Sequence, residues 1–297
     1  MFAIAPLSRP CNESTLRFVA EQDRNVYWLF MHSKNATEIR RTCFSSQMLD
    51  DILYYQTLVR KYVAQRQDTP AFIIIASDSN VYNLGGDLDL FIQLIRSQDH
   101  ASLLDFARRC VQCVYGFNSC LDSDVHSIAL VQGNALGGGF EVALSCKTIV
   151  AEEGASLGFP EIIFDLFPGM GAYSFMRQRI SSHLAERIMI DGKTYTAEEM
   201  HKIGLVDYLV PKGKGKHMVE KLISNHQRIN NGWKAIQQAR RITDPVTYEE
   251  LMRITEIWAK SAVQLGKKSL RTMERLVYAQ NKKVSKSHQV VESCVNE

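Results

Sequence analysis

Three consecutive glycines, Gly137 to Gly139, stand where an apolar, strand-like run ends and a helical pattern begins. A strand-to-helix turn without β-carbons lets a ligand approach the main chain closely. Amides at the start of the helix then face that ligand with the positive end of the helix dipole. These donors suit a phosphate, or the oxygen of a developing enolate or tetrahedral adduct. The glycines alone are more typical of a structural turn.

A second glycine pair, Gly85 and Gly86, follows another strand-like run, Phe72 to Ala76. Two separate strand-to-helix junctions can therefore each offer one amide to the same oxygen, which is the arrangement of an oxyanion hole. A phosphate-binding loop fits less well. The Lys-Ser/Thr pair of a Walker loop is missing, and the glycine spacing is not that of a dinucleotide fingerprint.

Two carboxylates stand alone in apolar surroundings. Glu141 lies three residues after Gly138 in an otherwise apolar helical stretch, and Glu161 follows Pro160 in the apolar run 158–164. A carboxylate is costly to bury, and a partly dry pocket raises its pKa toward the working pH of a general acid or base. The alternative for Glu141 is a surface glutamate that the helix dipole favours. Beside an amide site, two such carboxylates suit removal of an α-proton and loss of a β-hydroxyl from a thioester.

The elements that must position these residues are strands and helices in alternation. In the first half of the chain, short β-branched runs alternate with amphipathic stretches, a pattern typical of α/β units. The pattern predicts strands over Val26 to Met31, Phe72 to Ala76, Ser127 to Val131 and Thr148 to Ala151. It predicts helices over Ser46 to Ala64, Ser102 to Cys120 and Gly138 to Cys146.

From Lys216 to Gln280 the apolar residues recur at helical spacing, which predicts a second, all-helical part. Its wide, aromatic apolar face should pack on the core or on a neighbouring subunit. We therefore expect a core over residues 1–211, a C-terminal helical region over 212–280 and a disordered tail over 281–297.

Composition argues against several classes of function. A net charge of +3 is too small to indicate a nucleic-acid partner, and no window approaches the apolar length that spans a bilayer. The first residues lack the pattern of a signal peptide, so we expect a cytoplasmic protein. Seven cysteines, an odd number, argue against a disulfide framework. Cys110 and Cys113 lack the second pair of ligands that a zinc site would need. The histidines show no metal-ligand spacing, so we expect neither a metal nor another cofactor.

The run Gly133-Asn-Ala-Leu-Gly-Gly-Gly-Phe-Glu141 resembles the signature of the enoyl-CoA hydratase, or crotonase, superfamily. The interval of 20 residues between the two glutamates matches the catalytic pair of that family. The resemblance implies an α/β fold with a crotonase-like ββα spiral core and a C-terminal helical region. It implies that Glu141 and Glu161 are catalytic and that the Gly86 and Gly138 amides form the oxyanion hole. It also implies a homo-oligomer, either a trimer or a hexamer.

Longer runs, over residues 76–87, 159–176 and 266–277, are similar to the bacterial diffusible signal factor synthases. This resemblance implies a quorum-sensing enzyme whose substrate is a medium-chain 3-hydroxyacyl thioester of acyl carrier protein. The enzyme would dehydrate the substrate to the cis-2-enoyl thioester and hydrolyse that to the free acid. Two alternatives stay open: an ordinary enoyl-CoA hydratase or isomerase without hydrolysis, and a non-catalytic binding partner of a sensor kinase. Retention of both glutamates and both glycine pairs argues against the non-catalytic alternative.

As a mechanistic hypothesis, which the residues alone do not decide, we assign the two glutamates different roles. Glu161 would remove the C2 proton, and Glu141 would protonate the departing 3-hydroxyl group. The acyl tail would need an apolar tunnel. Candidate substrate-binding residues, of which the larger apolar ones are more typical of a plain core, are Gly85, Leu136, Gly137, Leu166, Met170, Phe175 and Trp258.

Overall fold

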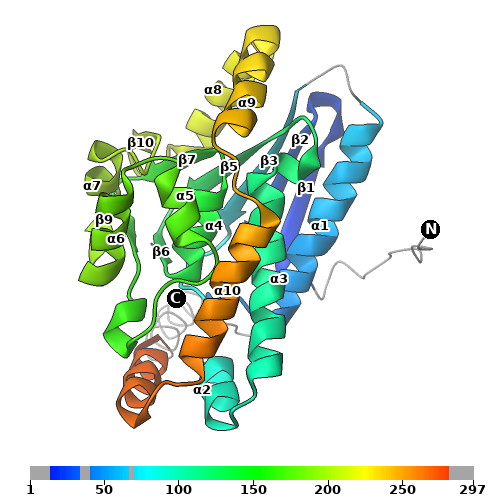
Figure 1. The fold of residues 1–297 in the computed structure, drawn as a ribbon. Coiled ribbons are helices and arrows are strands. Elements are labelled where there is room, and N and C mark those ends of the chain that lie inside the picture. Colours follow the sequence, from blue (N-terminus) through cyan, green and yellow to red (C-terminus); the bar gives the residue numbers. More distant parts are fainter. Residues whose placement is uncertain (1–13, 34–40, 67–69, 281–297) are drawn as a thin grey trace, which may run out of the picture.

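The computed structural model describes residues 14–33, 41–66 and 70–280. Its centre is a six-stranded sheet in the order β1-β2-β3-β5-β7-β10 (Figure 1). Only β1 runs antiparallel to its neighbour, and the other pairs are parallel. The strands are β1 (Leu16–Glu21), β2 (Val26–Met31), β3 (Ala71–Ser77), β5 (Val125–Val131), β7 (Thr148–Glu152) and β10 (Tyr208–Val210).

A second, four-stranded sheet is built from three-residue strands in the order β4-β6-β8-β9. The strands are β4 (Val81–Asn83), β6 (Asn134–Leu136), β8 (Ser156–Gly158) and β9 (Thr194–Thr196). Each of β3, β5 and β7 in the first sheet is followed along the chain by a short strand of the second. A helical segment comes next each time, so the chain repeats a ββα unit. The α/β class and the spiral core expected from the sequence are confirmed.

The two faces of the large sheet bury different side chains. Alternate strand residues such as Leu29 and Ile75 join the main core with α1 and α3, while Trp28 and Ile74 on the opposite face pack with α8. Because both faces are covered, the parallel strands are apolar at nearly every position. This continuity is why β2, β3, β5 and β7 could be predicted from the sequence.

The helices lie between the strands and after the last strand. They are α1 (Ser46–Ala64), α2 (Leu88–Arg96), α3 (His100–Asn118), α4 (Gly138–Ser145), α5 (Ala172–Arg177), α6 (Ser182–Asp191), α7 (Ala197–Lys202), α8 (Gly215–Arg228), α9 (Asn230–Thr243) and α10 (Tyr248–Ala262). Three 3-10 turns, η1 (Gln22–Arg24), η2 (Cys120–Asp122) and η3 (Glu161–Phe164), join them. Residues 267–280 are also helical.

The helix that we predicted over Ser102 to Cys120 is displaced by two residues at both ends. It begins at His100 because the Asp99 side chain accepts a hydrogen bond from Ser102 N and caps it. It ends before Cys120 because the chain there turns into left-handed backbone. The predicted helix over Ser46 to Ala64 has the bounds of α1.

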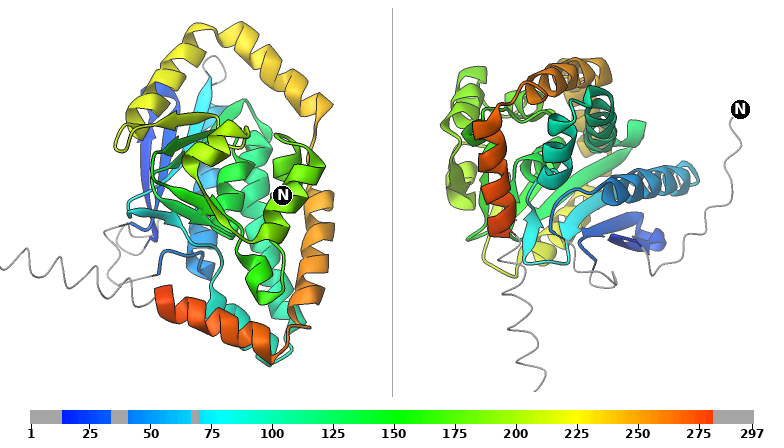
Figure 2. Two further views of the ribbon diagram at one scale, coloured as in Figure 1. Left: turned by 90° about the vertical axis from the view of Figure 1, so that its left-hand side faces the viewer. Right: turned by 90° about the horizontal axis from the view of Figure 1, so that it is seen from below.

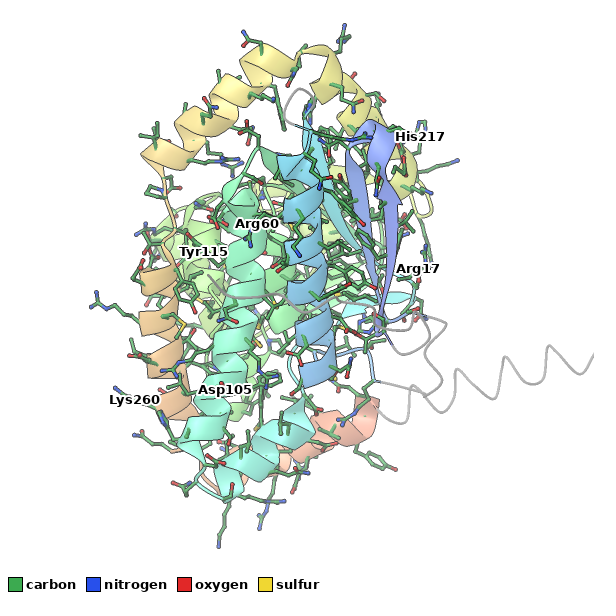
Figure 3. The ribbon with its side chains drawn as sticks, turned by 90° about the vertical axis from the view of Figure 1, so that its right-hand side faces the viewer. Arg17, Arg60, Asp105, Tyr115, His217 and Lys260 are labelled. Atoms are coloured by element: carbon green, nitrogen blue, oxygen red, sulfur yellow. The ribbon has the colours of Figure 1, made fainter. Side chains whose placement is uncertain are left out.

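Of the C-terminal helices, α8 and α10 bury residues against the core of their own chain. Helix α8 buries Val219, Leu222 and Ile223 against the large sheet, whereas α9 has no buried residue. Helix α10 lies alongside α3, with α1 on the other side of α3 (Figure 3). The red helix over residues 267–280 crosses the end of the molecule that holds α2 (Figure 2), and Arg96 of α2 pairs with Glu274. The expected tail, residues 281–297, lies outside the described residues.

No helix in the described part of the chain combines the length and apolarity of a membrane span.

Candidate active site

Two glycine loops meet at the start of α4. The first, between β4 and α2, contains Gly85 and Gly86, and the second, after β6, contains Gly137 and Gly138. A Cβ built on Gly85 would lie 3.2 Å from Gly138 N, and one built on Gly138 would lie 3.6 Å from Gly86 N. The loops are therefore packed backbone to backbone, which only residues without side chains allow.

Two of the four glycine N–H groups in these loops form hydrogen bonds within the protein. Gly85 N donates to Asn83 Oδ1 at 2.8 Å, and Gly137 N donates to the Gly158 carbonyl oxygen at 2.9 Å. Within the described residues, the Gly86 and Gly138 N–H groups make no such hydrogen bond, and both glycines line the same cavity. Gly138 is the first residue of α4, where N–H groups have no partner within the helix and the helix dipole adds positive potential.

Glu141 lies on the first turn of α4, with only 2 % of its surface exposed. Its Oε1 accepts hydrogen bonds from Met170 N at 2.7 Å and from Ala172 N at 3.0 Å. Burial raises the pKa of this carboxyl group to about 7, and these backbone donors limit the rise. The carboxylate is therefore held rigidly by a loop that lies about 30 residues further along the chain.

Glu161 begins the turn η3, and its carboxyl group faces the glycines of the second loop. A Cβ built on Gly137 would lie 2.3 Å from Glu161 Oε1. The other oxygen, Oε2, is buried and has no hydrogen-bond partner in the described part of the chain. Burial and the nearby charge of Glu141 raise the pKa of Glu161 to about 8. An unpaired, buried carboxyl oxygen has a proton to give or a lone pair free to take one from a substrate.

A cavity of about 280 Å³ connects the two carboxyl groups with the two amide donors. Its other walls are almost wholly apolar and come from distant parts of the chain. The floor is made by α2, α3 and α10, with Phe91, Phe106, Ala107, Cys110 and Trp258. The arrangement combines a polar corner that can polarise a carbonyl oxygen with a dry compartment for an apolar tail.

Comparison with known proteins decides the family. The model of the enoyl-CoA hydratase/isomerase family matches residues 54–286, which is most of the chain. The chain belongs to this family. It is 33% identical over 149 residues to the peroxisomal fatty acid beta-oxidation multifunctional protein AIM1 of Arabidopsis thaliana. It is 30% identical over 155 residues to the 2,3-dehydroadipyl-CoA hydratase of Escherichia coli.

These matches cover about half of this chain, 50% and 52%, and 20% and 57% of the two relatives. Among solved structures, an enoyl-CoA hydratase/isomerase from Xanthobacter autotrophicus superposes with a TM-score of 0.71 at 19% identity. That superposition covers 92% of this chain and 96% of the other, and it shows the shared fold.

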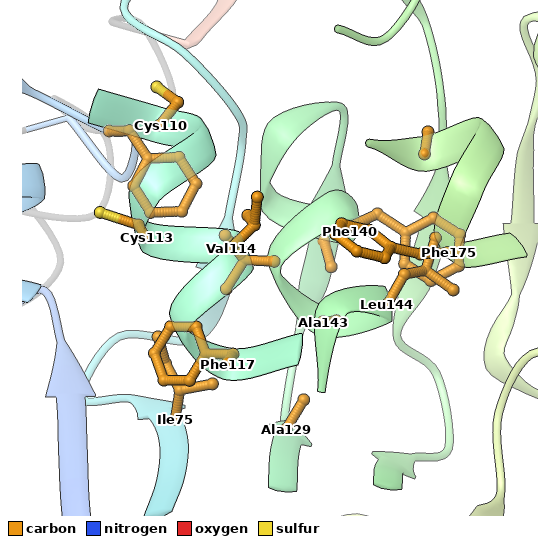
Figure 4. Close-up of a cluster of buried hydrophobic side chains, with 14 of the residues drawn as sticks. Ile75, Cys110, Cys113, Val114, Phe117, Ala129, Phe140, Ala143, Leu144 and Phe175 are labelled. Carbon is orange, nitrogen blue, oxygen red and sulfur yellow. The ribbon is translucent and has the colours of Figure 1, made fainter. Parts of the chain in front are cut away.

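Within this family fold, the structure brings most of the sequence-predicted site residues to one cavity. Both glutamates, both predicted amide donors and the predicted substrate contacts Gly85, Leu136, Gly137, Leu166, Met170 and Trp258 line it. The exception is Phe175 of α5, which is fully buried and does not line the cavity. It packs beside Phe140 and Leu144 of α4 (Figure 4), so its surroundings are those of a core residue.

Except for Trp258, the residues that form the floor of the cavity were not predicted from the sequence. The buried faces of α2 and α3 supply Phe91, Phe106, Ala107 and Cys110. Helical spacing indicates that these side chains are buried, but not whether they contact the core or a cavity. Cys110, for which the sequence argues only against a metal site, lies in the cavity wall. The sequence does not indicate this position, because the same apolar residue types line a cavity for an acyl tail and fill a core.

The raised pKa values predict how stability depends on pH. Because the folded state keeps protons on Glu141 and Glu161 that the unfolded chain releases above about pH 4.5, these groups lower the free energy of unfolding as pH rises from about 5 to 8. Glu161→Gln removes one such group. We expect the variant to gain stability relative to the wild type on the order of 1–3 kcal/mol between pH 5 and pH 8, measured by urea unfolding.

Glu153, an exposed residue next to β7, provides the matched control for this measurement. Glu153→Gln should show no comparable gain across the same pH range. A difference between Glu161→Gln and wild type that stays constant from pH 5 to pH 8 would contradict the shifted pKa.

Proposed function

We propose that this chain dehydrates a medium-chain 3-hydroxyacyl-[acyl carrier protein] and hydrolyses the product to a cis-2-unsaturated fatty acid, a diffusible quorum-sensing signal. The cavity carries the proposal, because it joins an apolar compartment to two carboxyl groups and two convergent amide donors. A second observation supports it. The run 159–176, which resembles the signal factor synthases, is the segment that supplies Glu161 and holds Glu141.

In the dehydration, the thioester oxygen accepts hydrogen bonds from the Gly86 and Gly138 N–H groups. The carboxylate of Glu161 removes the C2 proton, and the electron pair moves onto this oxygen as an enolate. The pair then returns to form the C2=C3 double bond as the C3–O bond breaks. Glu141 donates its proton to the departing hydroxyl group, which leaves as water. Over the step, the proton on the carboxyl pair moves from Glu141 to Glu161.

Burial raises the pKa of both carboxyl groups toward neutrality, so the pair can hold and release a proton near pH 7 to 8. By microscopic reversibility, the same two groups serve the loss of water and the addition of water to a double bond. The similarity to the 2,3-dehydroadipyl-CoA hydratase of Escherichia coli favours a second candidate function, an enoyl-CoA hydratase without hydrolysis.

In the hydrolysis, the same two amides would stabilise the tetrahedral adduct of water with the thioester carbonyl. An ionised glutamate of the pair would take a proton from the attacking water. Collapse of the adduct breaks the C–S bond, and the carrier leaves as a thiol after it takes up a proton. This step needs no residue beyond those that dehydration uses.

Product analysis separates the two candidates. The purified protein is incubated with 3-hydroxydodecanoyl-[acyl carrier protein] and, separately, with the coenzyme A thioester, and the products are analysed by chromatography and mass spectrometry. We expect free cis-2-dodecenoic acid from the carrier-protein substrate. An enoyl thioester that stays on its carrier would reduce the function to dehydration alone. Unchanged substrate on both carriers would contradict catalysis on this acyl group and favour the non-catalytic binding partner.

A further inference from the structure

Helix α10 contacts the loop that holds Glu141 through one stripe of residues. Leu251, Thr255 and Trp258 recur at intervals of four and three residues, which places them on one face of the helix. A Cβ built on Gly169 would lie 2.3 Å from Trp258 Cγ, and one built on Gly171 would lie 2.8 Å from Leu251 Cδ2. The loop is therefore pressed against α10 on both sides of Met170.

Thr255 forms the polar contact of this stripe. Its hydroxyl group is fully buried and donates to the Gly169 carbonyl oxygen at 2.9 Å. A threonine inside a helix usually donates to the carbonyl group four residues earlier in the same helix. Thr255 instead donates to a residue that is 86 positions away in the sequence.

The Gly169 carbonyl group and the Met170 N–H group belong to one planar peptide unit. On one side this unit accepts the hydrogen bond from Thr255, and on the other it donates to Glu141 Oε1 at 2.7 Å. A rotation of the unit cannot change one bond without changing the other. Bonds in such a chain also polarise one another, so the threonine strengthens the donor that faces the carboxylate.

We propose that Thr255 is a positioning residue for Glu141, acting through the single peptide unit between Gly169 and Met170. The C-terminal helix is then part of the catalytic apparatus as well as a wall of the cavity. Without the hydroxyl group, the buried Gly169 oxygen loses its partner, and the Met170 N–H group is free to turn away from the carboxylate. This inference rests on the proposed function only where it predicts the effect of Thr255 on the rate of the reaction.

Thr255→Val keeps the shape of the side chain and removes the hydrogen bond, whereas Thr255→Ser keeps the bond. We expect Val to lower kcat for the 3-hydroxyacyl thioester about three- to tenfold with little change in KM. The alkaline limb of the pH–rate profile, along which Glu141 loses the proton that it donates, should move to higher pH, because Glu141 loses a donor that favours its ionised form. Thr255→Ser should restore both. Thr57→Val is the matched control, since Thr57 of α1 donates only to Leu53 of its own helix.

A second measurement needs no substrate. Hydrogen–deuterium exchange at residues 168–172 of the free protein should be faster in Thr255→Val than in wild type, Thr255→Ser or Thr57→Val. Unchanged exchange in the Val variant would overturn the coupling, even if the wild type proved inactive on every thioester tested. Where the wild type is active, an unchanged kcat and pH profile in Thr255→Val, or an equal loss in Thr255→Ser, would overturn the positioning role.

Discussion

Replacing either Glu141 or Glu161 with glutamine is expected to lower turnover of an acyl thioester by about 10²–10⁴-fold. Glutamine has the shape of glutamate but neither gives nor takes the proton that the reaction moves. At position 141 its amide oxygen can still accept the bonds from Met170 N and Ala172 N, so the loop should keep its place. The loss should therefore appear in kcat more than in KM.

Steady-state kinetics of the two variants, with circular dichroism to confirm the fold, make this measurement. Glu153→Gln serves again as the control, because this exposed glutamate lies outside the cavity. It should leave kcat unchanged. Turnover within a few-fold of wild type in either Glu141→Gln or Glu161→Gln would contradict the assignment of that residue to the chemistry.

Gly137→Ala is expected to lower activity by about 10²-fold or more, although no reacting group is removed. The new Cβ would lie 2.3 Å from Glu161 Oε1, so the carboxyl group must move. It would also lie on the turn that sets the Gly138 amide at the start of α4. Both the carboxylate and one oxyanion donor should therefore be displaced.

Gly154→Ala separates this effect from backbone strain. Gly154 has a φ of +83° and Gly137 a φ of +53°, so backbone strain makes an alanine unfavourable at both. A Cβ on Gly154, however, meets nothing within 4 Å. Thermal unfolding should show a loss of stability in both variants, larger in Gly137→Ala because of the contact with Glu161, and kinetics should show a loss of activity in Gly137→Ala alone. Equal activities would show that the Glu161 contact has no catalytic consequence.

The sequence predicts those parts of the fold in which burial itself produces a pattern. Strand β3 is apolar throughout because both of its faces are covered, and α1 shows the spacing of a helix with one buried face. The strands of the second sheet escape prediction because each has only three residues, too few to show a period. Strand β1 escapes for another reason. It is half-buried at an edge and mixes polar with apolar residues.

The candidate site divides in the same way. Glu141 and Glu161 can be found in the sequence because a charge among apolar residues is conspicuous. The groups that hold Glu141 in place cannot be found in this way. Met170 and Ala172 act through backbone N–H groups that every residue except proline has, and Thr255 acts from a helix that the sequence places far away. The misassignment of Phe175 has a related cause, because core and cavity walls draw on the same apolar side chains.

Exchange of the C2 hydrogens of a saturated dodecanoyl thioester in deuterium oxide, followed by mass spectrometry, measures whether Glu161 removes the C2 proton. The substrate has no 3-hydroxyl group, so only proton removal by Glu161 and enolate stabilisation by the Gly86 and Gly138 amides are measured. We predict enzyme-dependent deuterium uptake at C2 that Glu161→Gln abolishes and Glu141→Gln retains. Absence of uptake with the wild type, or equal uptake with Glu161→Gln, would contradict proton removal by Glu161.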